Sequence, residues 1–219
     1  ASVDGVAAWL SKDMGRHLSG QTAWRGQIDL LEDGERIRIE SDLLGLDSRL
    51  PAPLAKTAAQ PLPLVVNIQP QGTDKQIEVS LGQTVGAVWR STADGRLARG
   101  ELRFGGTPVL PTAPGLRLAG TGRGLDVSGW LALLPDREGG EPLPLSAMDL
   151  KFDTLDLLGR RYQDVRLQGS NRNGLFRTQV NGRELNGVLN YRPAGALSAR
   201  VSAQFKQLTI PDAVIPSGD

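Results

Sequence analysis

The chain has 219 residues, a net charge of +1 and no cysteine, and only 5% of its residues are aromatic. Its length allows one large domain or two small ones that share a sheet. The balanced charge and the few aromatic residues argue against a nucleic-acid partner. The absence of cysteine excludes disulfides and thiolate metal sites. His17 is the single histidine, and we expect neither a metal nor a cofactor.

Residues 1–20 are predicted to form a short amphipathic helix that precedes the main domain, residues 21–219. Apolar residues recur there at the spacing of one helix face. They are Val6, Trp9, Leu10 and Met14. Either Gly15 or Gly20 is available to end the helix.

From residue 21 onward, apolar and polar residues alternate, which is typical of antiparallel strands with one dry and one wet face. Residues 22–30 and 35–42 flank Asp33-Gly34, a dipeptide that favours a tight hairpin turn. Similar segments recur along the chain, so we expect an all-β antiparallel meander. The apolar residues that best define its dry face are Ile77, Val79, Leu81, Val85, Trp89, Leu197, Val201 and Phe205.

A few stretches interrupt this alternation. Residues 50–63 are rich in proline and leave room for a short helix over residues 52–59. Residues 106–115 are predicted to form a loop, because their prolines do not fit a central strand. Residues 120–124, GTGRG, lack the spacing of a phosphate-binding loop and indicate a flexible turn instead. Residues 125–134 are predicted to form a strand.

No catalytic arrangement is recognisable in the sequence. There is no G-x-S-x-G string, and His17 has no acidic or serine partner at a meaningful spacing. The acidic residues mostly fall at predicted turns and on the wet face of the first hairpin. Carboxylates at such positions are expected to be exposed to water and need no catalytic role to account for them. We therefore expect that the protein is not an enzyme.

The dry face has more than one interpretation. It can form the interior of a closed β-sandwich that acts as a structural or protein-interaction module. It can also belong to a strongly curved sheet that lines a groove for an apolar ligand. Periodicity alone favours the sandwich. A polysaccharide-binding surface would need exposed aromatic platforms, whereas Trp24, Trp89 and Trp130 lie in alternating segments where burial is expected.

Several strings resemble the YhdP branch of the AsmA-like proteins. Residues 39–56, IESDLLGLDSRLPAPLAK, are similar to a stretch of that branch with the pattern SDL-GL-S-LPAPL-K. The preceding WRGQIDL and the later GLDVSGW, LDLLGRRYQDVRL and NGVLNY resemble further elements of the branch. The similarity extends from about Gly20 to Pro211, and its most specific part is the proline-containing stretch.

The resemblance implies a periplasmic segment of a large protein that an N-terminal helix anchors in the inner membrane of Gram-negative bacteria. Repeated β-sheets in such proteins form a long curved trough with an apolar interior, and the proteins are implicated in moving phospholipid toward the outer membrane. The resemblance brings no catalytic residues. The implied partners are phospholipids, other segments of the same longer chain, and envelope proteins. The curved groove thus becomes the leading hypothesis, with the eight dry-face residues named above as its candidate lining and residues 50–63 as a flap at its edge or mouth.

Overall fold

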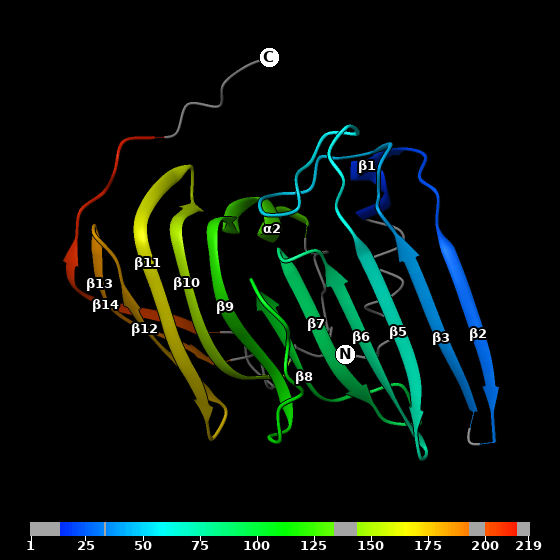
Figure 1. Cartoon of the computed structure of the whole chain (residues 1–219). Helices are drawn as coiled ribbons and strands as arrows, with labels where there is room; N and C mark the ends of the chain where they lie inside the picture. Colours follow the sequence, from blue (N-terminus) through cyan, green and yellow to red (C-terminus); the bar gives the residue numbers. More distant parts are fainter. Residues whose placement is uncertain (1–13, 33, 134–143, 193–199, 214–219) are drawn as a thin grey trace.

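The computed structural model describes residues 14–32, 34–133, 144–192 and 200–213. These residues form one long sheet of twelve strands, a small two-stranded sheet and two short helices (Figure 1). The strand order in the long sheet is β14-β13-β12-β11-β10-β9-β8-β7-β6-β5-β3-β2. The prediction of a mostly antiparallel all-β fold is confirmed.

The alternating segments of the sequence form the strands of the long sheet. In chain order these are β2 (Arg25–Leu31), β3 (Gly34–Ser41), β5 (Leu64–Gln71), β6 (Asp74–Leu81), β7 (Val85–Ser91), β8 (Leu97–Phe104), β9 (Gly115–Asp126), β10 (Leu145–Leu157), β11 (Arg160–Arg172), β12 (Leu175–Asn181), β13 (Leu185–Arg192) and β14 (Arg200–Leu208). The remaining elements are the 3₁₀-helix η1 (Met14–His17), β1 (Leu18–Gly20), β4 (Leu46–Ser48) and α2 (Val127–Leu133). The turn at Asn173-Gly174 joins β11 to β12, and both residues have the positive φ that a type I′ turn requires.

The sheet departs from a pure antiparallel meander at β9, which pairs in parallel with both β8 and β10. A parallel pair needs a crossover connection, because the chain must return to the end from which it started. The loop 105–114 provides this return between β8 and β9. It crosses one face of the sheet, where Pro108 lies so close to Gly86 that a Cβ on this glycine would approach its Cδ to 2.7 Å.

Two expectations around β9 are wrong. Residues 120–124 are not a turn but lie inside β9, where their glycines make room for neighbouring strands. A Cβ at Gly122 would lie 2.7 Å from the ring of Phe152, which meets Phe104 edge to face with ring centroids 5.2 Å apart. Residues 127–133 form α2 instead of a strand, since the Asp126 carboxylate caps the helix by accepting the amide of Gly129 at 2.8 Å.

The two helices expected elsewhere also differ from the structure. Residues 1–13 lie outside the described residues, and the expected helix does not continue to Gly20, because residues 18–20 form β1 and pair with β4. Residues 52–59 form turns. The backbone of Lys56 pairs with that of Ser48 across the loop rather than within a helical turn.

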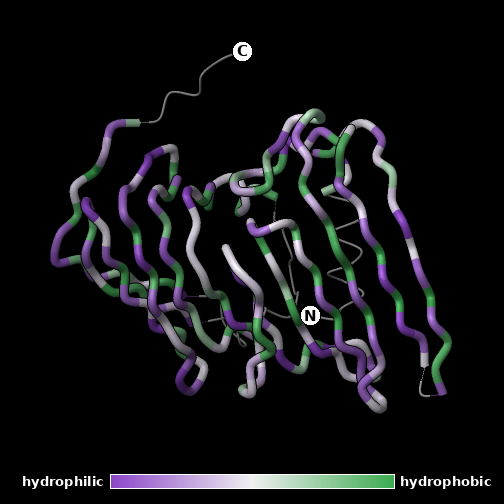
Figure 2. Tube along the Cα trace, in the orientation of Figure 1, coloured by the Kyte–Doolittle hydropathy of each residue, from purple (hydrophilic) through white to green (hydrophobic). Residues whose placement is uncertain are grey.

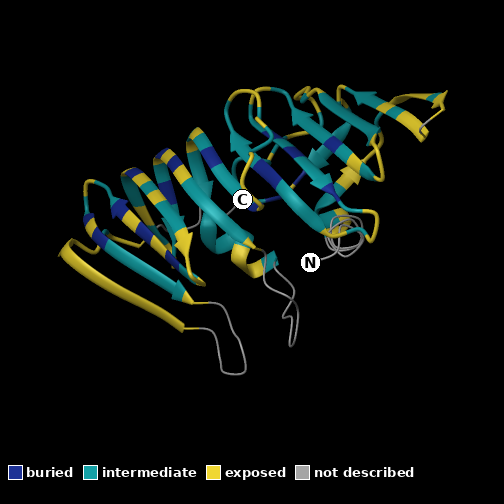
Figure 3. Cartoon of the chain, turned by 90° about the horizontal axis from the view of Figure 1, so that it is seen from below, coloured by how far each residue is buried: buried dark blue, intermediate teal, exposed yellow. Residues whose placement is uncertain are grey.

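The long sheet is strongly curved and forms an arch when seen from below, with α2 on the inner side (Figure 3). Hydrophobic and hydrophilic residues alternate along its strands (Figure 2). Val127 of α2 packs against a buried apolar cluster on the inner side. The members of this cluster are Leu155, Val165, Val180 and Leu185. We call this side of the sheet the inner face and the opposite side the outer face.

Candidate functional site

Apolar side chains of the inner face form rows that cross the whole sheet, because residues paired side by side in neighbouring strands point to the same face. One row consists of the register partners Ser41, Leu64, Leu81, Val85, Phe104, Gly120, Leu150, Leu167, Val180, Gly187 and Phe205. The next row consists of Gly26, Ile39, Val66, Val79, Ala87, Leu102, Leu118, Met148, Gly169, Thr178, Leu189 and Ala203. Each row holds a single polar side chain, so a continuous apolar stripe joins the first strands to the last.

Four of the residues predicted for the dry face lie in these two rows. Leu81 and Val85 are direct partners, and Phe205 lies in the same row although more than half of the chain separates it from them. Val79 lies in the next row. Residues that the sequence could assign only to the dry sides of separate strands therefore share one surface.

The other predicted residues extend this surface. Ile77 and Trp89 are partners in a third row, together with Ile68 of β5. Val201 pairs with Tyr191 at the opposite end of the sheet. The remaining predicted residue, at position 197, lies outside the described residues.

The inner face is exposed at both ends of the sheet. Ile28 of β2 is 64% exposed, and Val201 and Phe205 of β14 are 68% and 36% exposed. Between these ends, Val79 and Trp89 are half-buried. The described residues contain no second large sheet that covers this face, since their other sheet is the small pair β1 and β4. The described sheet is thus an open, curved apolar surface and not a closed barrel.

Residues 42–62, which we call the strap, connect β3 to β5 and contain most of the SDL-GL-S-LPAPL-K pattern. The two arms of the strap are joined by backbone hydrogen bonds between Ser48 and Lys56, at 2.8 and 3.0 Å. The ammonium group of Lys56 donates to the carbonyl oxygens of Leu43, at 2.9 Å, and Leu46. The lysine of the pattern therefore satisfies backbone acceptors of the strap.

The tip of the strap reaches α2. The carbonyl oxygen of Ala52 accepts hydrogen bonds from the amide of Asp126, at 3.2 Å, and from the indole nitrogen of Trp130, at 2.9 Å. Leu50 beside them is buried. The strap thus ties the ends of β3 and β5 to the end of β9, a strand that is not their neighbour in the sheet. Sequence reasoning missed this role of Trp130, for which the only signal was its place in GLDVSGW.

Replacing Trp130 with phenylalanine is expected to loosen the strap without unfolding the sheet. The substitution removes the indole donor and keeps an aromatic ring, while Ala52 retains the Asp126 amide as its donor. We expect a loss of about 1 kcal/mol in the free energy of unfolding, with faster hydrogen exchange at the amides of Ser48 and Lys56. Trp24→Phe, at an exposed indole, is the matched control. Unchanged exchange in the strap of Trp130→Phe would contradict this role.

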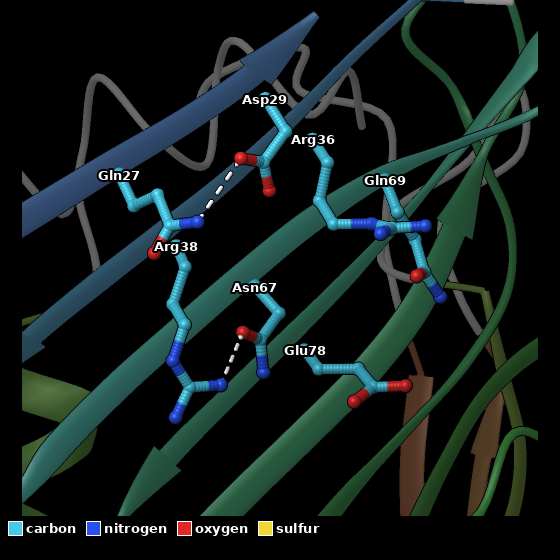
Figure 4. Close-up of a pocket in the computed structure, with 7 residues that line it drawn as sticks. All are labelled: Gln27, Asp29, Arg36, Arg38, Asn67, Gln69 and Glu78. Atoms are coloured by element: carbon cyan, nitrogen blue, oxygen red, sulfur yellow. Dashed lines mark hydrogen bonds between the residues drawn. The ribbon is translucent and has the colours of Figure 1, made fainter. Parts of the chain in front are cut away.

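The outer face carries a polar hollow of about 270 Å³ over β2, β3, β5 and β6 (Figure 4). It is lined by Gln27, Asp29, Arg36, Arg38, Asn67, Gln69 and Glu78. Gln27 donates to Asp29 at 3.0 Å, and Arg38 donates to Asn67 at 2.9 Å. Two acidic and two basic side chains balance each other there. The hollow is therefore a polar surface without net charge, and the apolar inner face remains the stronger candidate site.

Neither catalytic nor metal-binding geometry emerges from the described part of the chain. No group of three or more His, Cys, Asp or Glu residues within it is placed to hold a metal ion. The pKa of Asp94 is lowered because the Thr92 hydroxyl donates to its carboxylate, and Arg96 adds a smaller attraction. This carboxylate lies in the exposed turn between β7 and β8, away from the inner face, so its shift reflects turn structure.

Among the described helices, none combines the length and the apolar character needed to cross a membrane. A protein-family model described as YhdP protein matches residues 1–218. No curated protein and no solved structure matches the chain.

Proposed function

The chain belongs to the YhdP protein family, an AsmA-like family of envelope proteins, and from this premise we propose that its inner face shelters phospholipid acyl chains during transport between the inner and outer membranes. The observation that carries the proposal is the continuity of the apolar rows from the first strands of the sheet to β14. Their exposed ends allow the surface to continue into other segments of a longer periplasmic protein.

The energetics of such a surface fit a lipid better than a polar ligand. Each methylene group that leaves water contributes about 0.8 kcal/mol, and this gain needs no specific hydrogen-bonding partner. Polar head groups can remain in water at the open side of the arch. Movement along the surface would then be passive, with direction set elsewhere, and no catalytic residue would be required.

A structural or protein-interaction module is the second candidate, and the sheet edges favour it. Every residue of β14 is exposed, and this strand and β2 each have only one neighbour in the long sheet. Such edges can accept a further strand from another segment or from an envelope protein. This role requires no lipid on the inner face, so a lipid-contact measurement separates the two candidates.

Tryptophan quenching by phospholipids with brominated acyl chains tests the proposal. In a chain that keeps only Trp89, with the other tryptophans replaced by phenylalanine, we expect strong quenching because Trp89 lies on the inner face. The matched control carries Gln179→Trp as its only tryptophan, on an exposed outer-face position of β12. Equal quenching of the two chains, or none in either, would contradict an acyl-chain site on the inner face.

A further inference from the structure

Four arginines lie on the outer face of β7, β8 and β9, and two of them pair with the carboxylate of Glu101. The side chain of Glu101 is fully buried, and its Oε1 accepts the Nε of Arg103 at 2.7 Å and the amide of Val109 at 3.1 Å. Arg117 approaches its Oε2 with Nη1 at 3.3 Å. The negative charge of Glu101 is therefore already shared by two arginines and by the loop that covers it.

The other two arginines, Arg90 and Arg99, are register partners on β7 and β8. Like charges directly opposite each other on neighbouring strands destabilise a sheet. Among the described residues, the Nε atoms of both side chains are buried without a hydrogen-bond partner, as is the Oε2 atom of Glu101. One weak contact, from Arg90 Nη2 to Gln71 at 3.5 Å, is the single side-chain hydrogen bond recorded for this pair among the described residues.

The carboxylate of Glu101, two residues from Arg99 on the same strand, pairs with Arg103 and Arg117 and not with Arg90 or Arg99. The further partners of Arg90 and Arg99 in the same row of the sheet are Gln76 and Gly115, which carry no charge. Among the described residues, neither arginine forms an ion pair with a carboxylate. Buried donors without an acceptor are costly and rare in folded proteins, and an ion or water commonly accounts for them. The unsatisfied charge and donors point to an anion at this place.

We propose that Arg90 and Arg99 together bind one phosphate group on the outer face. A guanidinium presents its donors in a planar fork that matches two oxygens of a phosphate. One tetrahedral anion between the two forks would give both Nε atoms an acceptor and replace repulsion with attraction. A free phosphate ion and the phosphate of an anionic lipid head group offer the same chemistry. The site lies on the face opposite the apolar rows, so it does not depend on acyl-chain binding there.

Thermal melting in sodium phosphate, against sodium chloride at equal ionic strength, tests the site. We expect the melting temperature of the wild-type chain to rise with phosphate and to saturate, as binding to the folded state requires. In Arg90→Gln and in Arg99→Gln, about tenfold more phosphate should be needed for the same rise in melting temperature. In chloride both variants should melt no lower than wild type, since each removes like-charge repulsion. Arg177→Gln, on an exposed outer-face position of β12, should respond as wild type does.

A general salting effect of phosphate would raise all four melting temperatures alike and without saturation, and that result would overturn the proposal. Flotation with vesicles identifies the source of the phosphate. Capture by phosphatidylglycerol vesicles but not by phosphatidylcholine vesicles, lost in Arg99→Gln, assigns the site to anionic lipid head groups. Saturable stabilisation by free phosphate without vesicle capture assigns it to the free ion. If vesicle capture persists in Arg99→Gln and the melting temperature rises with phosphate without saturation, Arg90 and Arg99 do not form a phosphate site.

Discussion

Replacing Phe152 with alanine is expected to lower the free energy of unfolding by about 3–5 kcal/mol, the cost usual for removing a buried aromatic ring. Phe152 is 1% exposed and packs edge to face against Phe104 at the parallel junction of the sheet. Gly122 beneath the ring has no side chain that could fill the space. The cavity should therefore persist, and equilibrium unfolding in urea measures its cost.

Phe205→Ala is the matched control, because it removes the same atoms from the same face of the same sheet. Phe205 lies on the edge strand β14 and is 36% exposed, so we expect a loss of about 1 kcal/mol. Equal losses at the two positions would mean that the inner face near β14 is packed as densely as the parallel junction. That result would contradict an inner face that is open at its end.

The strands and their dry sides were predictable from the sequence because side chains alternate with a period of exactly two residues in a strand. Ile77, Val79 and Leu81 could be assigned to one side without knowing any partner. Joining them to Val85 required only the short turn between β6 and β7. Placing Phe205 in the same row required the register of every intervening strand, which a local pattern does not contain.

The parallel junction was not predictable from alternation. Strands β8 and β9 carry the same pattern that an antiparallel pair would carry, and only the loop 105–114 distinguishes the two arrangements. The run GTGRG indicated a turn because glycine weakens strands. In the structure, side chains and backbone atoms of adjacent strands pack directly against these glycines, as the ring of Phe152 does against Gly122. A tertiary contact therefore overrides a local preference.

The same limit applies to the strap and to the buried carboxylate. In the sequence, Lys56 resembles an ordinary surface lysine. In the structure, its ammonium group donates hydrogen bonds to the carbonyls of Leu43 and Leu46. Glu101 alternates with apolar neighbours as any residue of a wet face does. It becomes buried because the loop after β8 crosses the outer face and donates the amide of Val109 to it. Burial of this kind depends on the path of a loop, and residue type alone does not reveal it.

Val201→Asp is expected to leave the chain folded and to abolish most of its binding of phospholipid. Val201 is 68% exposed on the inner face of β14, so a carboxylate there can reach water and should cost little stability. An acyl chain that passes the same position would meet a charge. At the centre of a bilayer such a charge costs roughly 2.5–3.5 kcal/mol, so we expect a loss of about tenfold or more in affinity.

Ser202→Asp introduces the same charge one residue further along the strand, on the outer face, and should change neither melting nor bound phospholipid. Melting temperature and lipid content, measured on all three chains, distinguish an open groove from a covered one. If another segment or a partner closes the inner face at β14, the new charge of Val201→Asp is buried without a partner and costs several kcal/mol. A collapsed melting temperature for Val201→Asp alone would then favour the closed interaction module over the lipid groove.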